Sequence, residues 1–273
     1  MLKKSFALLA TCLLVFSILA GCSKKSDSEK SDLQADNSVA PTFERLVSKD
    51  AAGNAQTVNG STIYDCYNFE SIDSETVRIT SFYSQTKGSS AAPTEDAQSY
   101  VRCLDPHTVV VPEKLAGKTV VKISALAFYT KSEISDLVLP ESLTVIENCA
   151  FAGCCNLRSV ALPSAVTELG IGAFYNCTSL TTLRFALSSA LATIPQSAFA
   201  DCAALTAINL PGYIKTVEAG AFLNCTSVAT LTLAEGLVTI EDQAFQNLDA
   251  LTAVPELPST VTKVGKLNPW AEK

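Results

Sequence analysis

The sequence predicts a β-rich α/β solenoid of about six repeats, preceded by a small N-terminal β region. The first observation is a recurring Ala-Phe pair, which starts at positions 127, 150, 173, 198, 221 and 244 and is therefore spaced by 23, 23, 25, 23 and 23 residues. The second is that the same frame of apolar residues returns around every pair. A period of this length is typical of solenoids, because one such coil buries too little apolar surface to fold alone and must stack on its neighbours.

Each repeat is predicted to contain one short strand and one short helical turn. The apolar positions follow neither a 3.6-residue period nor a strict alternation, so a single long helix or strand does not fit. The strand corresponds to the segment L-x-x-V-x-L-P and the helical turn to A-F-x-x-C. The position before the cysteine holds residues that tolerate a left-handed backbone, as a turn leaving a helix requires. These residues are Gly153, Asn176, Asp201, Asn224 and Asn247.

The first 21 residues have the layout of a secretory signal peptide, with two lysines followed by a long uncharged apolar run. The run ends in Leu19-Ala20-Gly21-Cys22, which resembles the lipobox of bacterial lipoproteins. The resemblance implies that residues 1–21 are removed and that Cys22 carries the lipid of the mature chain. The alternative is an uncleaved membrane helix, because about 17 uncharged residues approach the length that spans a bilayer.

Residues 22–41 are polar and almost without large apolar side chains, which predicts a flexible tether. Residues 42–107 follow as a small β region, in which the β-like segments STIYDCYNF, ETVRITSFY and SYVRCL are separated by loops. This region contains Cys66 and Cys103, a candidate disulfide in an exported chain. A bridge between them would stabilise the fold by about 3–4 kcal/mol. Two unpaired thiols are the alternative.

The repeat pattern resembles the BspA-type leucine-rich repeat, a class that also occurs in treponemal surface proteins. The matching pattern is L-P-x-x-φ-x-x-I-x-x-x-A-F-x-x-C-x-x-L, in which φ is apolar, and it extends over residues 108–264. The resemblance implies a leucine-rich repeat solenoid wound as a right-handed coil, with a longer first coil between Pro112 and Ile123. One coil departs from the pattern, because Phe185-Ala186 replaces Leu-Pro and two residues are inserted.

Residues 265–273 end the solenoid as a cap or as a frayed tail. Asn268-Pro269 stands where the next Ala-Phe pair belongs, so the repeat is broken at this point. A solenoid exposes an apolar face at its end unless an atypical repeat covers it. Pro269 halts the helical turn, and Trp270 has the size to cover the open end. A frayed tail is the alternative.

Four cysteines occupy the same slot in successive coils: Cys154, Cys177, Cys202 and Cys225. Stacked strands lie about 4.8 Å apart, so these residues form a straight ladder instead of converging on one point. A zinc site needs its sulfur atoms about 2.3 Å from one ion, which such a ladder cannot provide. We therefore predict small buried hydrophobic residues, in agreement with Leu248 in the same slot. The states of Cys149 and Cys155 stay open.

The composition and motifs do not favour an enzyme. The formal charge of −7 argues against nucleic acid or an anionic membrane surface as the main partner. His107 is the single histidine, and its context DPHTVVVP predicts a turn residue rather than a catalytic base. We identify no paired carboxylates, metal triad or phosphate loop in the sequence, and we expect no cofactor. An activity residing in residues 41–107 is a minor alternative.

The outward side chains of the predicted strands form a candidate partner-binding strip. Its residues are Arg158, Arg184, Asn209 and Thr232. The strip is small and neutral to weakly basic. It fits either a plain solvated sheet face or a broad docking surface for a protein or a glycan.

The family resemblance implies a cell-surface adhesin, because BspA-type proteins bind host matrix or plasma proteins, or other bacteria. The leading hypothesis is therefore a lipid-anchored protein-binding module of the bacterial envelope, at the outer membrane or cell surface. The alternative is a periplasm-facing structural or assembly scaffold. The location of the repeats discriminates between the two.

Overall fold

The computed structural model describes residues 42–50, 52–58, 61–87, 100–102 and 105–270. The chain divides into two units, Met1–Ala40 and Pro41–Lys273, and the described residues belong to the second. The predicted signal peptide, Cys22 and the tether lie outside the described residues. In the described part of the chain, no helix is long and apolar enough to cross a membrane.

The chain begins with an antiparallel sheet, which we call the N-terminal sheet. It pairs β1 with β3 and β3 with β4, and β2 and β5 are added at its edges. The strands are β1 (Thr42–Val47), β2 (Thr57–Val58), β3 (Ser61–Ser71), β4 (Thr76–Lys87) and β5 (Tyr100–Arg102). Apart from the buried Cys66, strand β3 alternates in burial, with Ile63, Tyr67 and Phe69 facing the core. This alternation is the period-2 pattern of a half-buried strand.

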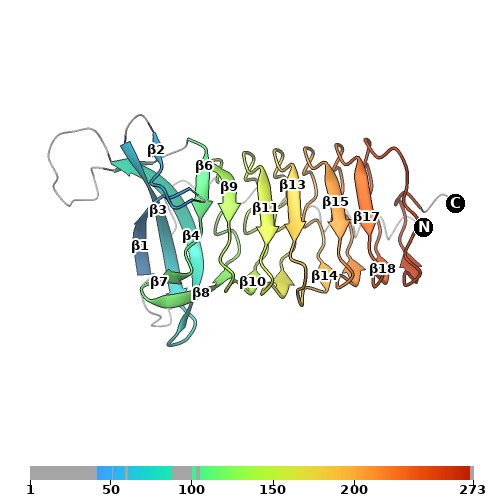
Figure 1. The fold of residues 1–273 in the computed structure, drawn as a ribbon, viewed down its shortest axis with the longest axis horizontal. Coiled ribbons are helices and arrows are strands. Elements are labelled where there is room, and N and C mark those ends of the chain that lie inside the picture. Colours follow the sequence, from blue (N-terminus) through green and yellow to red (C-terminus); the bar gives the residue numbers. More distant parts are fainter. Residues whose placement is uncertain (1–41, 51, 59–60, 88–99, 103–104, 271–273) are drawn as a thin grey trace, which may run out of the picture. The chain divides into compact units, whose positions relative to one another are not determined.

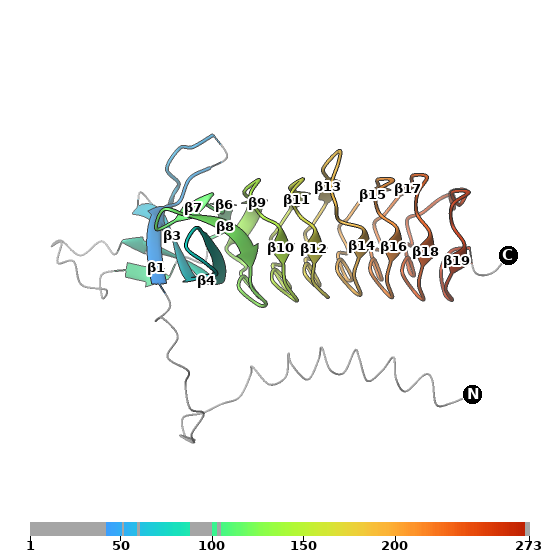
Figure 2. The same cartoon turned by 90° about the horizontal axis from the view of Figure 1, so that it is seen from below.

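The repeats form two rows of short parallel strands (Figure 1 and Figure 2). The first row contains β6 (His107–Val110), β9 (Ile134–Val138), β11 (Ser159–Leu162), β13 (Thr182–Phe185), β15 (Ala207–Leu210) and β17 (Thr230–Leu233). The second contains β8 (Lys118–Ile123), β10 (Val145–Ile146), β12 (Glu168–Leu169), β14 (Thr193–Ile194), β16 (Thr216–Val217), β18 (Thr239–Ile240) and β19 (Lys263–Val264), with β7 (Lys114–Leu115) beside β8. The fold is thus a β-solenoid with a spacing of about 23 residues, as the repeat pattern predicts.

The N-terminal sheet is continuous with the second row. Strand β4 pairs in parallel with β8, for example Val77 with Val120, and β8 then pairs with β10.

Both rows are interrupted at the coil with the two-residue insertion. The ladder of the first row ends at β13, and β15 pairs with β17 in a separate sheet; β12 and β14 likewise belong to different sheets.

A column of aromatic rings runs through the interior of the coils, and we call it the phenylalanine stack. Successive ring centroids lie 4.7 to 5.6 Å apart, which is the range of favourable offset stacking. The rings belong to Phe82, Phe128, Phe151, Phe174, Phe199, Phe222 and Phe245. The first ring comes from β4 of the N-terminal sheet, so this sheet starts the column.

The segment predicted as a short helical turn forms consecutive turns, and the described residues contain no α-helix. A left-handed residue lies before each alanine of the Ala-Phe pairs, and another lies four positions later, as at Cys149 (φ 53°) and Gly153 (φ 73°). Three intervening residues are too few for a helical turn to propagate, because left-handed residues interrupt a right-handed helix. The predicted left-handed position before the cysteine slot is confirmed in every coil.

Asn268 and Trp270 lie against the last coil. In five successive coils, the N–H of the stacked phenylalanine donates to the alanine carbonyl of the next coil at 2.8 Å. Asn268 stands in the alanine slot after the final coil, and its Oδ1 accepts the Phe245 N–H at 2.9 Å. Trp270 meets the Phe245 ring edge-on at 5.8 Å and donates its indole N–H to the Pro255 carbonyl at 2.7 Å. The side-chain amide of Asn268 therefore accepts the hydrogen bond that an alanine carbonyl accepts in the earlier coils.

Candidate functional site

The predicted strip lies on the outer face of the first row of strands. Arg158, Arg184, Asn209 and Thr232 are all exposed. Arg184 stands beside Ala161 in the β11–β13 register, and Asn209 stands beside Thr232 in the β15–β17 register. Arg158 precedes β11 and belongs to the neighbouring line of residues, where its carbonyl accepts the Thr181 N–H at 2.9 Å. The strip is therefore two adjacent lines of outward side chains.

Arg158 is a weakly held charge on this face. Its Nη2 lies 3.4 Å from the Asp136 Oδ2, and the two side chains are 62% and 39% exposed. An exposed ion pair of this kind contributes little to stability, because water screens both charges. The guanidinium therefore stays available to a partner at small cost.

Two surface hollows meet at Arg158, and we call them together the junction groove. Both include Pro106, Ser135 and Arg158 in their walls. One hollow, of about 580 Å³, extends along the first row and is also lined by Asn156, Thr178, Ser179, Thr181 and Ala204. The other, of about 390 Å³, reaches the N-terminal sheet and is also lined by Gln56, Thr57, Ile63, Asp105, His107, Thr108 and Asp136. Hydroxyls, amides and charges of both signs line the groove. Polar surface predominates beside the N-terminal sheet, whereas the hollow along the first row exposes more apolar than polar surface, so the groove offers a partner both kinds of contact.

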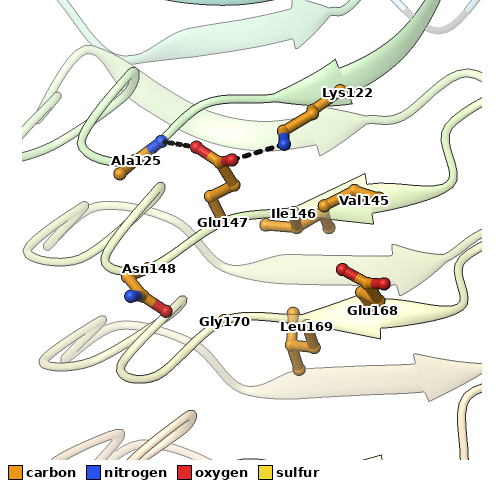
Figure 3. A pocket seen from close by; sticks show the side chains of 9 residues that line it. All are labelled: Lys122, Ala125, Val145, Ile146, Glu147, Asn148, Glu168, Leu169 and Gly170. Carbon is orange, nitrogen blue, oxygen red and sulfur yellow. Dashed lines mark hydrogen bonds and ion pairs between the residues drawn. The ribbon is translucent and has the colours of Figure 1, made fainter.

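A third hollow, of about 420 Å³, lies on the second row between β8, β10 and β12 (Figure 3). Lys122 pairs with Glu147 there at 2.5 Å, and the other Glu147 oxygen accepts the Ala125 N–H at 2.8 Å. The Lys122 hydrogen bond, together with that of the Ala125 N–H, lowers the pKa of Glu147 below its usual value. These polar groups hold neighbouring coils together.

Among the described residues, no group of three or more His, Cys, Asp or Glu side chains is arranged to hold a metal ion.

The four ladder cysteines Cys154, Cys177, Cys202 and Cys225 are buried free thiols. Each Sγ lies 3.1 to 3.3 Å from the carbonyl oxygen of a stacked phenylalanine in the preceding coil. The thiols therefore donate weak hydrogen bonds as well as filling space, a role that spacing alone did not predict. Burial raises the pKa of Cys154 and of Cys225 to about 12, so the reactive thiolate is suppressed.

The remaining cysteines differ in environment. Cys155 is exposed, and Cys149 is half-buried at a left-handed position. Cys66 is a fully buried free thiol on β3, and burial raises its pKa. Cys103 lies outside the described residues, so a bridge between Cys66 and Cys103 stays a prediction. Cys22, the predicted lipid-attachment residue, also lies outside them.

His107 is the first residue of β6, and the prediction that it lies in a turn is wrong. The side chain is buried, and Nε2 lies 3.1 Å from Asp65 Oδ1 on β3 and 3.2 Å from Ser84 Oγ on β4. Sequence reasoning missed both partners. One signal was present, because Asp65 stands between Ile63 and Tyr67 at a core-facing position of an alternating strand. A carboxylate at such a position needs a buried partner.

The chain matches one family of repeat proteins and resembles several solved structures. Residues 121–252 match the model of the BspA type leucine rich repeat region, in six copies. A leucine-rich repeat protein from Eubacterium ventriosum is 27% identical, with a TM-score of 0.50, and the match covers 57% of this chain and 44% of that one. A leucine rich cell surface protein from Faecalibacterium prausnitzii is 24% identical, with a TM-score of 0.56, and the match covers 78% of this chain and 51% of that one. This second likeness shows the fold alone.

The chain therefore spans about half the length of the two solved proteins that it resembles, 44% and 51% respectively. A search of curated proteins finds no match to the chain.

Proposed function

We propose that this chain, whose residues 121–252 form a BspA-type leucine-rich repeat region, is a lipid-anchored bacterial surface protein that binds another protein through its solenoid. The observation that carries the proposal is the exposed outer face of the first row of strands, joined to the junction groove. A rigid row of strands presents many weak contacts in one fixed geometry, which suits a broad partner better than a small molecule.

The polar chemistry of this face is consistent with a non-enzymatic role. Arg158, Arg184 and Asn209 are exposed and can donate hydrogen bonds to a partner. The candidate partners are a host matrix or plasma protein, another bacterial surface protein, or a glycan. An outward-facing location would support the adhesin-like role. A periplasm-facing structural or assembly scaffold is the alternative, because a lipid anchor by itself fits both.

Protease treatment of intact cells, followed by immunoblotting for the repeats, tests the location. Cleavage of the repeats, with a periplasmic control protein left intact, is expected for the surface protein. Survival of the repeats until the envelope is opened would reject the adhesin-like role and favour the scaffold.

A double substitution tests the face itself. Arg158→Ala with Arg184→Ala is expected to weaken adhesion of protein-bearing cells to immobilised host matrix and plasma proteins by about 10-fold or more, because exposed arginines are frequent binding hot spots. Lys263→Ala, an exposed cation on the second row, is the matched control and should leave adhesion unchanged. Equal adhesion of both variants would show that the first row is not the binding face.

A further inference from the structure

A buried polar cluster lies where the N-terminal sheet meets the first coil. It joins Asp65 of β3, Ser84 of β4 and His107 of β6. The side chains of His107 and Asp65 are only 4% and 2% exposed. Besides the contacts of His107 Nε2, Ser84 Oγ donates to Asp65 Oδ1 at 2.8 Å and His107 Nδ1 lies 2.9 Å from the Asp105 carbonyl oxygen. These bonds connect the antiparallel N-terminal sheet to the first of the parallel-stranded coils.

The hydrogen-bond partners determine how many protons the cluster holds. A carbonyl oxygen only accepts, so Nδ1 of His107 must carry a proton toward Asp105. The Ser84 hydroxyl proton is directed at Asp65. The 3.1 Å contact between His107 Nε2 and Asp65 Oδ1 then needs a second proton, because two lone pairs would otherwise face each other. The pair is therefore an imidazolium and a carboxylate that share this proton.

The surrounding charges favour that protonated state. Burial of His107 opposes a positive charge, but the hydrogen bonds to Asp65 and to the Asp105 carbonyl and the negative charges of Asp65 and Glu133 outweigh it, so the pKa of His107 is raised above 6.5. Glu133 is fully buried in the segment before β9, and its carbonyl accepts the His107 N–H at 2.9 Å. The hollow of the junction groove that reaches the N-terminal sheet is also lined by the charged side chains of Asp105, Asp136 and Arg158.

We propose that the Asp65–Ser84–His107 cluster is a pH-sensitive latch, which holds the N-terminal sheet against the first coil and weakens when the shared proton leaves. A group with a raised folded-state pKa stabilises the fold fully below its unfolded value, here 6.5. This contribution is lost as the pH rises through the folded-state pKa. The latch therefore loosens toward alkaline pH.

Uncharged hydrogen bonds across the same junction keep the N-terminal sheet on the first coil when the shared proton leaves, so the junction loosens but does not separate. Tyr67 donates its hydroxyl to the Val110 carbonyl at 3.1 Å, and Gln56 accepts the Thr108 N–H at 3.0 Å. These bonds do not titrate near neutral pH, so they persist when the latch opens. Above the folded-state pKa, the Ser84 hydroxyl can turn to His107 Nε2, 3.2 Å away, and satisfy the neutral ring.

The first test uses the fact that His107 is the single histidine of the chain. Its imidazole proton resonances in the full chain can be followed by NMR from pH 5 to 9 without ambiguity of assignment. We expect a midpoint above 6.5, and a midpoint about one unit or more lower in Asp65→Asn, which keeps the shape but removes the charge. Glu70→Gln is the matched control, since Glu70 pairs with Arg78 on the exposed face of the same sheet and should leave the midpoint unchanged.

The second test measures the junction itself by amide hydrogen exchange. After correction for intrinsic rates, peptides from β3 and β6 should open more readily between pH 6 and 9, up to about tenfold for each unit by which the folded-state pKa is raised. Peptides from β15 and β17 serve as an internal control and should not change. Asp65→Asn should abolish the pH dependence at the junction.

A midpoint at or below 6.5 in the unmodified chain would overturn the proposal. So would a raised midpoint without any pH-dependent exchange in β3 and β6, because the pair would then be a buried charge with no effect on docking. If Asp65→Asn does not fold, these two measurements on the unmodified chain decide the question alone.

Discussion

The N-terminal sheet and the repeat coils stabilise themselves in different ways. The sheet relies on individual pairings, such as the antiparallel register of β3 with β4, and on a buried polar cluster that occurs once. In the coils, each phenylalanine ring, thiol and backbone hydrogen bond is repeated by its equivalent in the next coil. Contacts that repeat from coil to coil stabilise the inner coils, which have a neighbour on both sides. The outermost coils lack one neighbour, so residues that do not repeat must stabilise them.

The largest expected effect comes from breaking the phenylalanine stack in its middle. Phe174→Ala removes a fully buried ring that stacks on Phe151 and Phe199 at 5.1 and 5.4 Å. We expect a loss of about 3–5 kcal/mol in the free energy of unfolding, because the ring leaves a cavity that neighbouring coils cannot close. Denaturant titration followed by circular dichroism measures it. Leu187→Ala, at a fully exposed side chain in the inserted coil, should change the same quantity by less than about 0.5 kcal/mol.

Removal of the terminal amide tests whether the end of the solenoid needs its own residues. Asn268→Ala leaves the Phe245 N–H without its acceptor and the Glu241 carbonyl without the Asn268 Nδ2 donor at 2.7 Å. We expect a cost of about 1–3 kcal/mol, measured in the same titration, because buried polar groups lose their partners. Amide hydrogen exchange should increase most in the last coil. Uniform exchange along the solenoid would show that this residue does not act as a cap.

Substitutions in the cysteine ladder test whether its thiols act through packing or through their reactivity. Cys202→Ala removes a buried thiol and its 3.3 Å contact with the Phe174 carbonyl, and we expect a loss of about 1–2 kcal/mol with an unchanged oligomeric state. Cys155→Ala, at an exposed thiol, is the control and should have almost no effect. In the native protein, an alkylating reagent should modify Cys155 and spare the ladder. A ladder without free thiols in the unfolded, unreduced protein would contradict this interpretation.

The smallest effect concerns the ion pair between Lys122 and Glu147 on the second row. The Lys122 hydrogen bond holds the pKa of Glu147 below 4.5, so its contribution is present above that value and is lost as the pH falls through the lower folded-state pKa. Because the side chains are 27% and 32% exposed, Glu147→Gln should cost less than about 1 kcal/mol at pH 7. The difference from the unmodified chain should vanish once the pH has fallen below the folded-state pKa of Glu147. A difference that persists there would indicate packing instead of charge.

The sequence predicts the repeating part of the fold well, because a recurring residue marks a recurring environment. The left-handed residues before the cysteine slot and the break at Asn268-Pro269 were both recognisable. The helical turn was predicted wrongly, since a second left-handed residue, such as Cys149, precedes each Ala-Phe pair and leaves no room for a helix.

The junction was harder to predict, because it depends on contacts that occur once. His107 meets Ser84 and Asp65 across 23 and 42 residues of chain, and no periodic pattern relates these positions. The thiol bonds of the ladder were missed for a different reason. Spacing shows that the cysteines are equivalent, but it does not show which carbonyl oxygen each Sγ meets.

The way the solenoid ends has a consequence for the gene. Every coil offers its alanine carbonyl to the phenylalanine N–H of the coil before it, and Asn268 Oδ1 accepts the Phe245 N–H in the same way. An in-frame duplication or deletion of one whole coil therefore leaves both ends with the neighbours they require. The number of coils can therefore change by unequal recombination between repeats. The coil with two inserted residues shows that a small insertion is also accommodated, because the later coils keep the same ring and backbone contacts.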